Sequence, residues 1–180
     1  MLGGSFCGYG ATQLWQDFWL WEHLLNRHSG LRRIVELGTA YGGFSLYLAT
    51  QARYRNLTFH TFDSIDHATA PLDQLFGRPD ERPRAAPLGD SFKRVELVRD
   101  GPATEVTTLL GVPVALFCDN GDKVREVALY APLLTPSSLC VVHDWQTEID
   151  EEDIPDCLEE RYGELCDEIG AMSRVFERCR

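Results

Sequence analysis

The chain has 180 residues, of which 17 are basic and 28 are acidic, so its formal charge is −11. This length suits a single domain over residues 1–180, and a hydrophobic fraction of 44% is typical of an ordered globular protein. The acidic balance argues against nucleic acid as a partner, because affinity for phosphates depends on basic side chains.

The acidic charge is concentrated in residues 148–168, which hold eleven acidic side chains and one basic side chain. We interpret this segment as the solvated face of a helix, with a docking surface for a basic partner as the alternative. The rest of the chain is close to neutral. No apolar run approaches the ~20 residues that a membrane span needs, so no membrane association is expected.

The six cysteines show no metal-binding spacing, and the first residues lack the charged and apolar regions of a secretion signal. Reduced thiols are common in the cytoplasm, where disulfides are rare. We therefore expect a cytoplasmic protein.

In chain order, apolar side chains at helical spacing first predict a helix over residues 14–28. Short apolar runs and helix-like stretches then alternate. The predicted strands are 34–37, 57–62, 95–98, 114–118 and 139–142, and the predicted helices between them are 44–52, 103–110 and 123–134. A helix over 154–169 and a closing edge strand over 173–179 complete the chain.

This alternation predicts an α/β fold of the Rossmann-like, doubly wound type, with a mostly parallel sheet and helices on both faces. We divide the domain into an N-terminal helical segment (1–30), a cofactor-binding core (31–145) and an acidic C-terminal helix with its edge strand (146–180). In such sheets ligands bind outside the carboxyl ends of the strands, where the strand order reverses. The residues that follow each strand are therefore the candidates for a site.

The first predicted strand runs into VELGTAYGGFS, residues 35–45. Its glycines allow a tight turn and close approach of the backbone to a ligand, and the next helix presents free N–H groups. The Gly-x-x-x-Gly-Gly spacing differs from the dinucleotide pattern. Glu36 would suit an ammonium or sulfonium group and would repel a diphosphate.

This segment resembles the first motif of class I S-adenosylmethionine-dependent methyltransferases, nearest the branch of small-molecule O-methyltransferases and cephalosporin-hydroxylase-like proteins. The resemblance extends over about residues 33–145 and implies S-adenosylmethionine as the cofactor. By this resemblance, the methionine half of the cofactor would be lined by Glu36, Gly38, Thr39, Ala40, Gly42 and Ser45. Residues ahead of the first helix would fold over its amino-acid end: Gly8, Tyr9, Gly10 and Gln13.

Asp63 and Ser64 follow the second predicted strand. An acid here can accept hydrogen bonds from both ribose hydroxyls, in dinucleotide-binding and methyltransferase folds alike. We assign both residues to the cofactor site, with capping of the next helix as the alternative for Asp63. Asp100, after the third strand, can accept the adenine amino group, or it can belong to an ordinary Asp-Gly-Pro turn.

The fourth strand ends in Phe117-Cys118-Asp119-Asn120-Gly121-Asp122-Lys123. By the resemblance, Asp119 lies beside the transferred methyl group. Lys123 is a candidate general base if burial depresses its pKa, and otherwise a solvated lysine in a first helical turn.

The fifth strand ends in His143-Asp144-Trp145. In metal-dependent members of the branch, acids at the ends of the fourth and fifth strands bind a divalent cation. The resemblance thus implies Mg²⁺ bound by Asp119 and Asp144, with Asn120 or His143 as a further ligand. Metal-free base catalysis by His143, and a purely structural role, stay open. Neighbouring strand residues point to opposite faces, so His143 and Asp144 share the site only if the strand has already ended.

These residues predict a methyltransferase that moves a methyl group to an oxygen, or less readily a nitrogen, of a small-molecule acceptor, with assistance from Mg²⁺ or a base. One alternative is a non-catalytic relative that binds cofactor or a partner. A homodimer would complete a pocket that the short segment 146–180 leaves open. A NAD-dependent Rossmann oxidoreductase is the other alternative, and the glycine spacing and Glu36 count against it.

Overall fold

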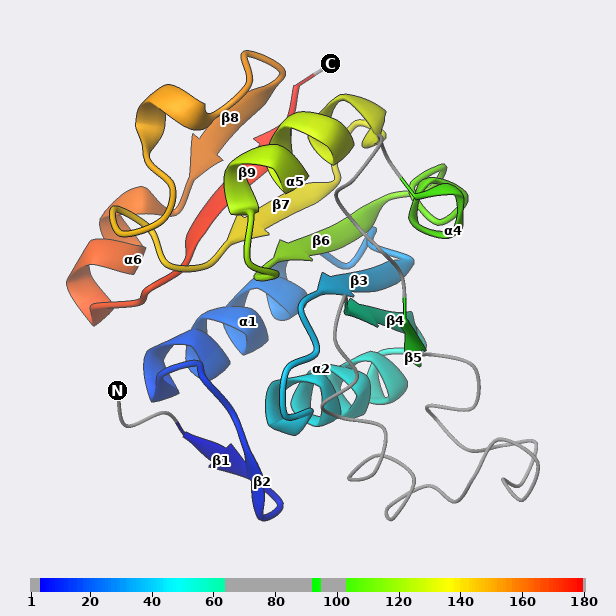
Figure 1. Cartoon of the computed structure of the whole chain (residues 1–180), viewed down its shortest axis with the longest axis vertical. Coiled ribbons are helices and arrows are strands. Elements are labelled where there is room, and N and C mark those ends of the chain that lie inside the picture. Colours follow the sequence, from blue (N-terminus) through cyan, green and yellow to red (C-terminus); the bar gives the residue numbers. More distant parts are fainter. Residues whose placement is uncertain (1–3, 64–91, 95–102, 180) are drawn as a thin grey trace.

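A computed structural model of the chain describes residues 4–63, 92–94 and 103–179. Its described part begins with a small hairpin of β1 (Ser5–Phe6) and β2 (Tyr9–Gly10), followed by helix α1 (Trp15–Arg27). The main sheet and its helices follow (Figure 1). Its strands are β3 (Arg33–Leu37), β4 (Thr58–Asp63), β5 (Phe92–Arg94), β6 (Val114–Cys118), β7 (Leu139–Val142), β8 (Leu158–Arg161) and β9 (Arg174–Arg178).

Across the described residues the main sheet has the order β5-β4-β3-β6-β7-β9-β8. All pairs from β5 to β7 are parallel, whereas β9 is antiparallel to both β7 and β8. From β3 the chain first builds outwards through β4 and β5, and then returns to the other side of β3 with β6. This reversal places the switch point between the carboxyl ends of β3 and β6.

Helices cover both faces of the sheet (Figure 1). The alternation of β6 shows why, since Phe117 packs with α1 and α2 (Gly43–Tyr54), while Leu116 packs with α5 (Lys123–Tyr130) on the other face. Two buried apolar clusters therefore flank one sheet. The predicted α/β fold, with a mostly parallel sheet and helices on both faces, is confirmed.

The predicted elements of the core agree closely with the described ones, apart from two shorter helices. The segment predicted as helix 103–110 contains α4 (Thr104–Thr107), and the helix predicted over 123–134 ends as the 3-10 turn η1 (Ala131–Leu133) after α5. The strand predicted over 95–98 lies outside the described residues.

The acidic C-terminal segment corrects two predictions. Residues 154–169 do not form one helix: a 3-10 turn, η2 (Glu151–Asp153), leads to strand β8, and only α6 (Gly163–Ile169) is helical. Tyr162, with a left-handed φ of 61°, separates the strand from the helix. β9 is not the edge strand, because it pairs with both β7 and β8, and β8 forms the edge.

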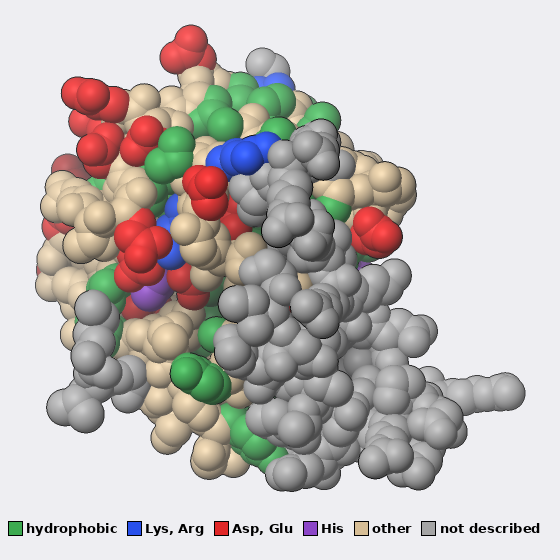
Figure 2. Space-filling view, in the orientation of Figure 1, with side chains coloured by type: hydrophobic (Ala, Val, Ile, Leu, Met, Phe, Trp, Pro, Cys, Tyr) green, Lys and Arg blue, Asp and Glu red, His purple; other side chains and the backbone are tan. Residues whose placement is uncertain are grey.

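In the part of the chain that the structure describes, no helix combines the length and apolarity needed to cross a bilayer. Acidic side chains gather over the part of the surface where β8 and the segment before it lie (Figure 2).

Candidate active site

The turn after β3 fits closely against the end of β6. Gly38 has a φ of +102°, and a Cβ added there would lie 2.3 Å from the backbone oxygen of Asp119. The Gly38 amide donates to the Phe62 carbonyl at 2.7 Å, and the Asp119 amide donates to Leu37 at 2.8 Å. A side chain at position 38 would therefore strain the backbone and separate the two strand ends.

Asp63, at the end of β4, holds the same turn from the other side. Its Oδ2 accepts a hydrogen bond from the Ala40 amide at 2.8 Å, and the residue is 5% exposed. Ala40 itself has a left-handed φ of 44°. Asp63 therefore lies directly beside the turn that connects β3 to the next helix. Ser64 and Asp100, the other two predicted contacts of the cofactor's nucleoside half, lie outside the described residues.

Glu36 lies on the face of β3 that α2 covers, because strand residues alternate between faces. Ser45 donates a 2.5 Å hydrogen bond to its Oε2. Burial raises the pKa of Glu36 to about 8, despite the opposing hydrogen bonds from Ser45 and Thr61. Near neutral pH the group is therefore largely a neutral acid, in contrast to the carboxylate that the sequence suggested.

Beside the turn is a hollow of about 820 Å³. Ala40 lines it, whereas Gly38, Thr39, Gly42 and Ser45 are buried behind its wall. The residues around it come from the hairpin, the turn after β3 and the ends of β6 and β7. They are Gly4, Gly10, Ala11, Thr12, Ala40, Tyr41, Asp119, Gly121, Lys123, His143, Asp144, Thr147 and Glu148.

Lys123, the first residue of α5, lies among three carboxylates of this hollow. Its Nζ is 2.7 Å from Glu148 Oε2, 3.0 Å from Asp144 Oδ2 and 3.5 Å from Asp119 Oδ1. Burial opposes the charge, but the hydrogen bond to Glu148, the charge of Asp119 and the contacts with Asp144 outweigh it and raise the pKa of Lys123. Lys123 is therefore a buried ammonium, neither the solvated lysine nor the neutral base considered from the sequence.

His143 is enclosed by acids on both sides of its ring. Its Nδ1 lies 3.2 Å from Asp119 Oδ1 and from Asp144 Oδ1. Burial alone would lower the pKa of His143, but its close contacts with acids, those with Asp119 and Asp144 foremost, raise it to about 11. The imidazole is thus already protonated near neutral pH and cannot accept a substrate proton. In turn, the hydrogen bond to His143 lowers the pKa of Asp144.

His143 and Asp144 both reach the cluster because β7 ends at Val142. Asp144 then adopts a left-handed φ of 56°, which turns its side chain back towards His143. We expected the two residues to share the site only if the strand had already ended, and it has ended before both of them. Asn120, by contrast, directs its backbone amide to Glu126 at 3.4 Å and does not line the hollow.

Two residues ahead of β3 complete the cluster. Gln13 Nε2 donates to Asp119 Oδ2 at 2.5 Å, so the N-terminal segment contacts the site, and its place over the amino-acid end of a cofactor stays a prediction. Asp17 of α1 was missed: it is fully buried, and its Oδ2 lies 3.8 Å from His143 Nε2. The sequence signal that could have indicated its burial is its spacing from Trp21 and Leu24, which places it on the apolar face of the helix.

The residues fit a divalent cation poorly. Ligand atoms of Asp119, His143 and Asp144 lie within 4.8 Å of one another, a spacing that a metal can use. However, the ammonium of Lys123 already lies against both carboxylates, and His143 directs a protonated nitrogen at them. A positive ion would have to displace Lys123, so we derive no step through a metal.

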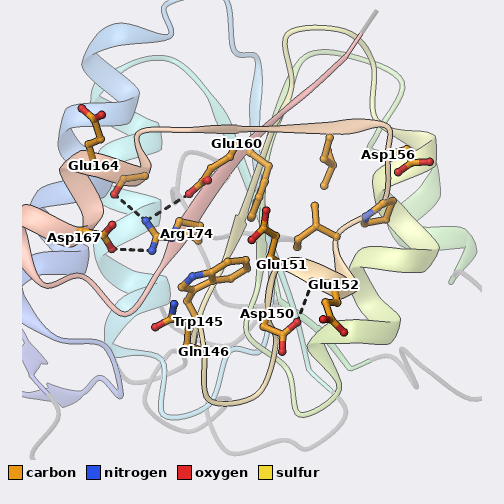
Figure 3. A pocket seen from close by; sticks show the side chains of 15 residues that line it. Trp145, Gln146, Asp150, Glu151, Glu152, Asp156, Glu160, Glu164, Asp167 and Arg174 are labelled. Atoms are coloured by element: carbon orange, nitrogen blue, oxygen red, sulfur yellow. Dashed lines mark hydrogen bonds and ion pairs between the residues drawn. The ribbon is translucent and has the colours of Figure 1, made fainter.

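A second hollow, of about 740 Å³, lies between β8, β9 and the segment 145–156 (Figure 3). Seven acidic side chains line it, and all are exposed. Arg174 is buried at its side, 2.7 Å from Asp167 and 3.4 Å from Glu160, with its guanidinium over the Trp145 ring. The acidic charges of this hollow are therefore solvated, and two of them are also paired with Arg174.

No protein-family model matches the chain, and no curated protein matches it. Among solved structures, a variant of MtNAS superposes with a TM-score of 0.56 at 10% identity, covering 92% of this chain and 61% of that one. The same variant in complex with S-adenosylmethionine gives a TM-score of 0.52 at 11% identity, with 92% and 62% covered. The chain has a class I methyltransferase-like fold.

A Staphylococcus aureus protein described as a caffeoyl-CoA O-methyltransferase also matches, at 17% identity over 71% of this chain and 56% of that one. Its TM-score of 0.47 adds nothing to the assignment of the fold. The chain spans about three fifths of the length of these three solved chains. At these identities the likeness concerns the fold, and the activity has to be argued from the site.

Proposed function

We propose that this protein transfers a methyl group from S-adenosylmethionine to an oxygen atom of a small-molecule acceptor. The observation that carries this proposal is the hollow at the switch point, which is lined by Ala40 of the turn that Asp63 holds and by a charged cluster. Two cationic and four acidic side chains give this cluster a formal charge of −2: Lys123, His143, Asp17, Asp119, Asp144 and Glu148. A cationic sulfonium would be stabilised beside it.

Asp63 would hold the cofactor by accepting hydrogen bonds from the ribose hydroxyls. The Ala40 amide fixes the orientation of its carboxylate, which reduces the side-chain entropy lost on binding. S-adenosylmethionine, when bound, supplies the methyl group on a positively charged sulfur. Catalysis by the protein would then be mainly positioning of the acceptor oxygen in line with that bond.

Glu148 is the best candidate to receive the acceptor's proton. Its side chain is 52% exposed, whereas the protonated His143 and Lys123 have no lone pair to offer. An acceptor hydroxyl that donates to Glu148 would also lie beside the Lys123 ammonium, 2.7 Å from the same carboxylate. Lys123 would then stabilise the negative charge that develops on oxygen during deprotonation.

Calorimetric titration with S-adenosylhomocysteine, with NAD⁺ in parallel, tests the cofactor. We expect one site for the former only, and Asp63→Ala should weaken it about tenfold to hundredfold, because a hydrogen bond to a charged group is lost. Binding of NAD⁺ alone would overturn the proposal in favour of an oxidoreductase.

Transfer is tested with radiolabelled cofactor and a panel of hydroxylated acceptors. Glu148→Gln should slow transfer by about 10²-fold while leaving affinity for S-adenosylhomocysteine unchanged, as expected for loss of a base. Glu151→Gln, an exposed acid outside this hollow, is the matched control and should transfer normally. Binding without transfer to any acceptor would favour the non-catalytic relative.

A further inference from the structure

The three carboxylates around Lys123 come from separate parts of the chain. Asp119 follows β6, Asp144 follows β7, and Glu148 lies in the next turn, yet all three direct an oxygen at the same Nζ. The Lys123 side chain is 3% exposed, and Asp119 is 8% exposed. This is a buried cationic centre with three oxygen neighbours, at the edge of the sheet where a divalent cation was expected.

The size of this cage suits an ammonium. Its oxygens lie 2.7, 3.0 and 3.5 Å from Nζ. Hydrogen bonds from an ammonium span about 2.7–3.2 Å, whereas oxygen ligands lie about 2.0–2.1 Å from Mg²⁺ and 2.3–2.6 Å from Ca²⁺. The oxygens of Glu148 and Asp144 lie within this hydrogen-bonding range, and Asp119 adds an ion pair at 3.5 Å.

The charge balance points the same way. Asp119 and Asp144 are held between Lys123 on one side and the Nδ1 of His143, 3.2 Å from each, on the other. A divalent cation added to this arrangement would face a positive neighbour in direct contact with its ligands. Among the described residues, removing only the lysine charge would leave Asp119 and Asp144 with His143 as their cationic partner, and Glu148 without the ion pair that it makes with Lys123.

We propose that the Lys123 ammonium is the resident cation of this site, occupies the position of a divalent metal and makes Mg²⁺ unnecessary. Replacing Lys123 by a neutral side chain would then convert the cage into a divalent-cation site. This inference concerns metal binding by the free protein, and its test uses neither cofactor nor acceptor. Its failure would leave the proposed methyl transfer untouched, and the converse also holds.

The experiment is a titration of the purified chain with Mn²⁺, followed by electron paramagnetic resonance of the free ion, with Mg²⁺ as competitor. The proteins are the wild type, Lys123→Met, Lys123→Gln, and Lys123→Arg as the control that keeps a cation. Lys123→Met combined with Asp144→Asn removes the lysine and one proposed ligand together, and Asp144→Asn alone removes that ligand while Lys123 stays. Asn suits position 144, because its backbone φ there is left-handed. Circular dichroism confirms that each variant is folded.

We expect no saturable binding by the wild type or Lys123→Arg up to about 1 mM, the range of weak sites. Lys123→Met or Lys123→Gln should bind one Mn²⁺ at least about tenfold more tightly than the wild type, and Mg²⁺ should compete. The double variant should lose this binding. Saturable binding by the wild type that Asp144→Asn abolishes would overturn the proposal. A folded neutral variant that binds no Mn²⁺ would also overturn it. If neither neutral variant folds, the comparison of wild type with Asp144→Asn decides.

Discussion

Glu36 is a carboxyl group in an apolar setting, and its protonation couples folding to pH. Burial under α2 raises its pKa to about 8 from an ordinary value of 4.5. Between these two pH values the folded chain keeps a proton that the unfolded chain has released. The contribution of Glu36 to stability is therefore complete below pH 4.5 and is lost as the pH rises through about 8.

We expect the free energy of unfolding to fall between about pH 5 and pH 8 through this group. Each unit of pKa shift corresponds to on the order of 1 kcal/mol. Glu36→Gln has the same shape without the charge, so it should remove this slope and be more stable than the wild type at about pH 8. Urea unfolding of both proteins across this range measures the difference, and a difference that stays constant with pH would contradict it.

Asp17 links helix α1 to the active-site cluster and to the C-terminal segment. It is fully buried and accepts hydrogen bonds from the Ser173 and Leu14 amides, each at 3.1 Å. Asp17→Ala would leave both donors unsatisfied and remove the acid that lies beside Nε2 of His143. We expect a loss of about 3–5 kcal/mol, the range for breaking a buried pair.

Urea unfolding tests this, with Asp122→Ala as the control. Asp122 also accepts from a helix amide, that of Arg125 at 3.2 Å, but it is exposed, so its removal should cost only about 1 kcal/mol. Equal losses in the two variants would show that Asp17 acts as a helix cap alone.

The sequence predicted which residues follow the strands, but not how they are charged or paired. Asp119, Lys123, His143 and Asp144 were all candidates because parallel strands bring their carboxyl ends to one edge. Asp17 was missed because its contact with His143 depends on how α1 packs across the sheet, which no local pattern encodes. The protonation of Glu36 was likewise missed, since burial decides it.

At the scale of elements, the acidic C-terminal segment shows how tertiary pairing overrides local preference. Glutamate favours helices, so residues 154–169 read as one helix. Leu158–Arg161 instead extend beside β9, which offers an open edge for hydrogen bonds along four residues. The exposed Glu159 and Glu160 are also suitable for an edge strand, because charged side chains discourage pairing with another chain.

Arg174 of β9 connects the strand β8 and the helix α6 of the C-terminal segment. Besides its contacts with Asp167 and Glu160, it donates to the Gly163 carbonyl at 2.8 Å and packs over Trp145. Arg174→Ala should lower stability by about 1–3 kcal/mol, through the lost carbonyl partner and packing. Amide exchange in α6 should accelerate at the same time, because Arg174 connects Gly163 and Asp167 of this helix to β9.

Arg161→Ala is the matched control for this prediction. Arg161 also contacts two acids, Glu159 at 3.0 Å and Glu177 at 3.1 Å, but it is 44% exposed. Solvent screens such pairs, so we expect a change below about 1 kcal/mol and unaltered exchange in α6. A larger effect from Arg161 than from Arg174 would be inconsistent with our description.

At the scale of the whole molecule, the alternation of apolar strands and helices was sufficient to predict the fold class. In the parallel part, β6 and β7 are apolar along their whole length because both of their faces are covered. The order of the strands was not predicted, since it depends on which side of β3 the chain returns to. The antiparallel insertion of β9 between β7 and β8 was not predicted either, because alternation alone indicates a strand and not its neighbours.

The uneven charge of the whole chain predicts a stabilising effect of salt. Residues 148–168 hold eleven acids and one base, and they fold against each other in β8, α6 and the turn before them. Their mutual repulsion destabilises the compact state and is screened over about 10 Å at 0.1 M salt. Raising NaCl from about 20 to 200 mM should therefore increase the free energy of unfolding by on the order of 1 kcal/mol.

A triple variant, Glu151→Gln, Glu152→Gln and Asp156→Asn, removes three exposed charges that line the acidic hollow. It should be more stable than the wild type at low salt and respond less to NaCl, and an unchanged salt response would show that the repulsion lies elsewhere.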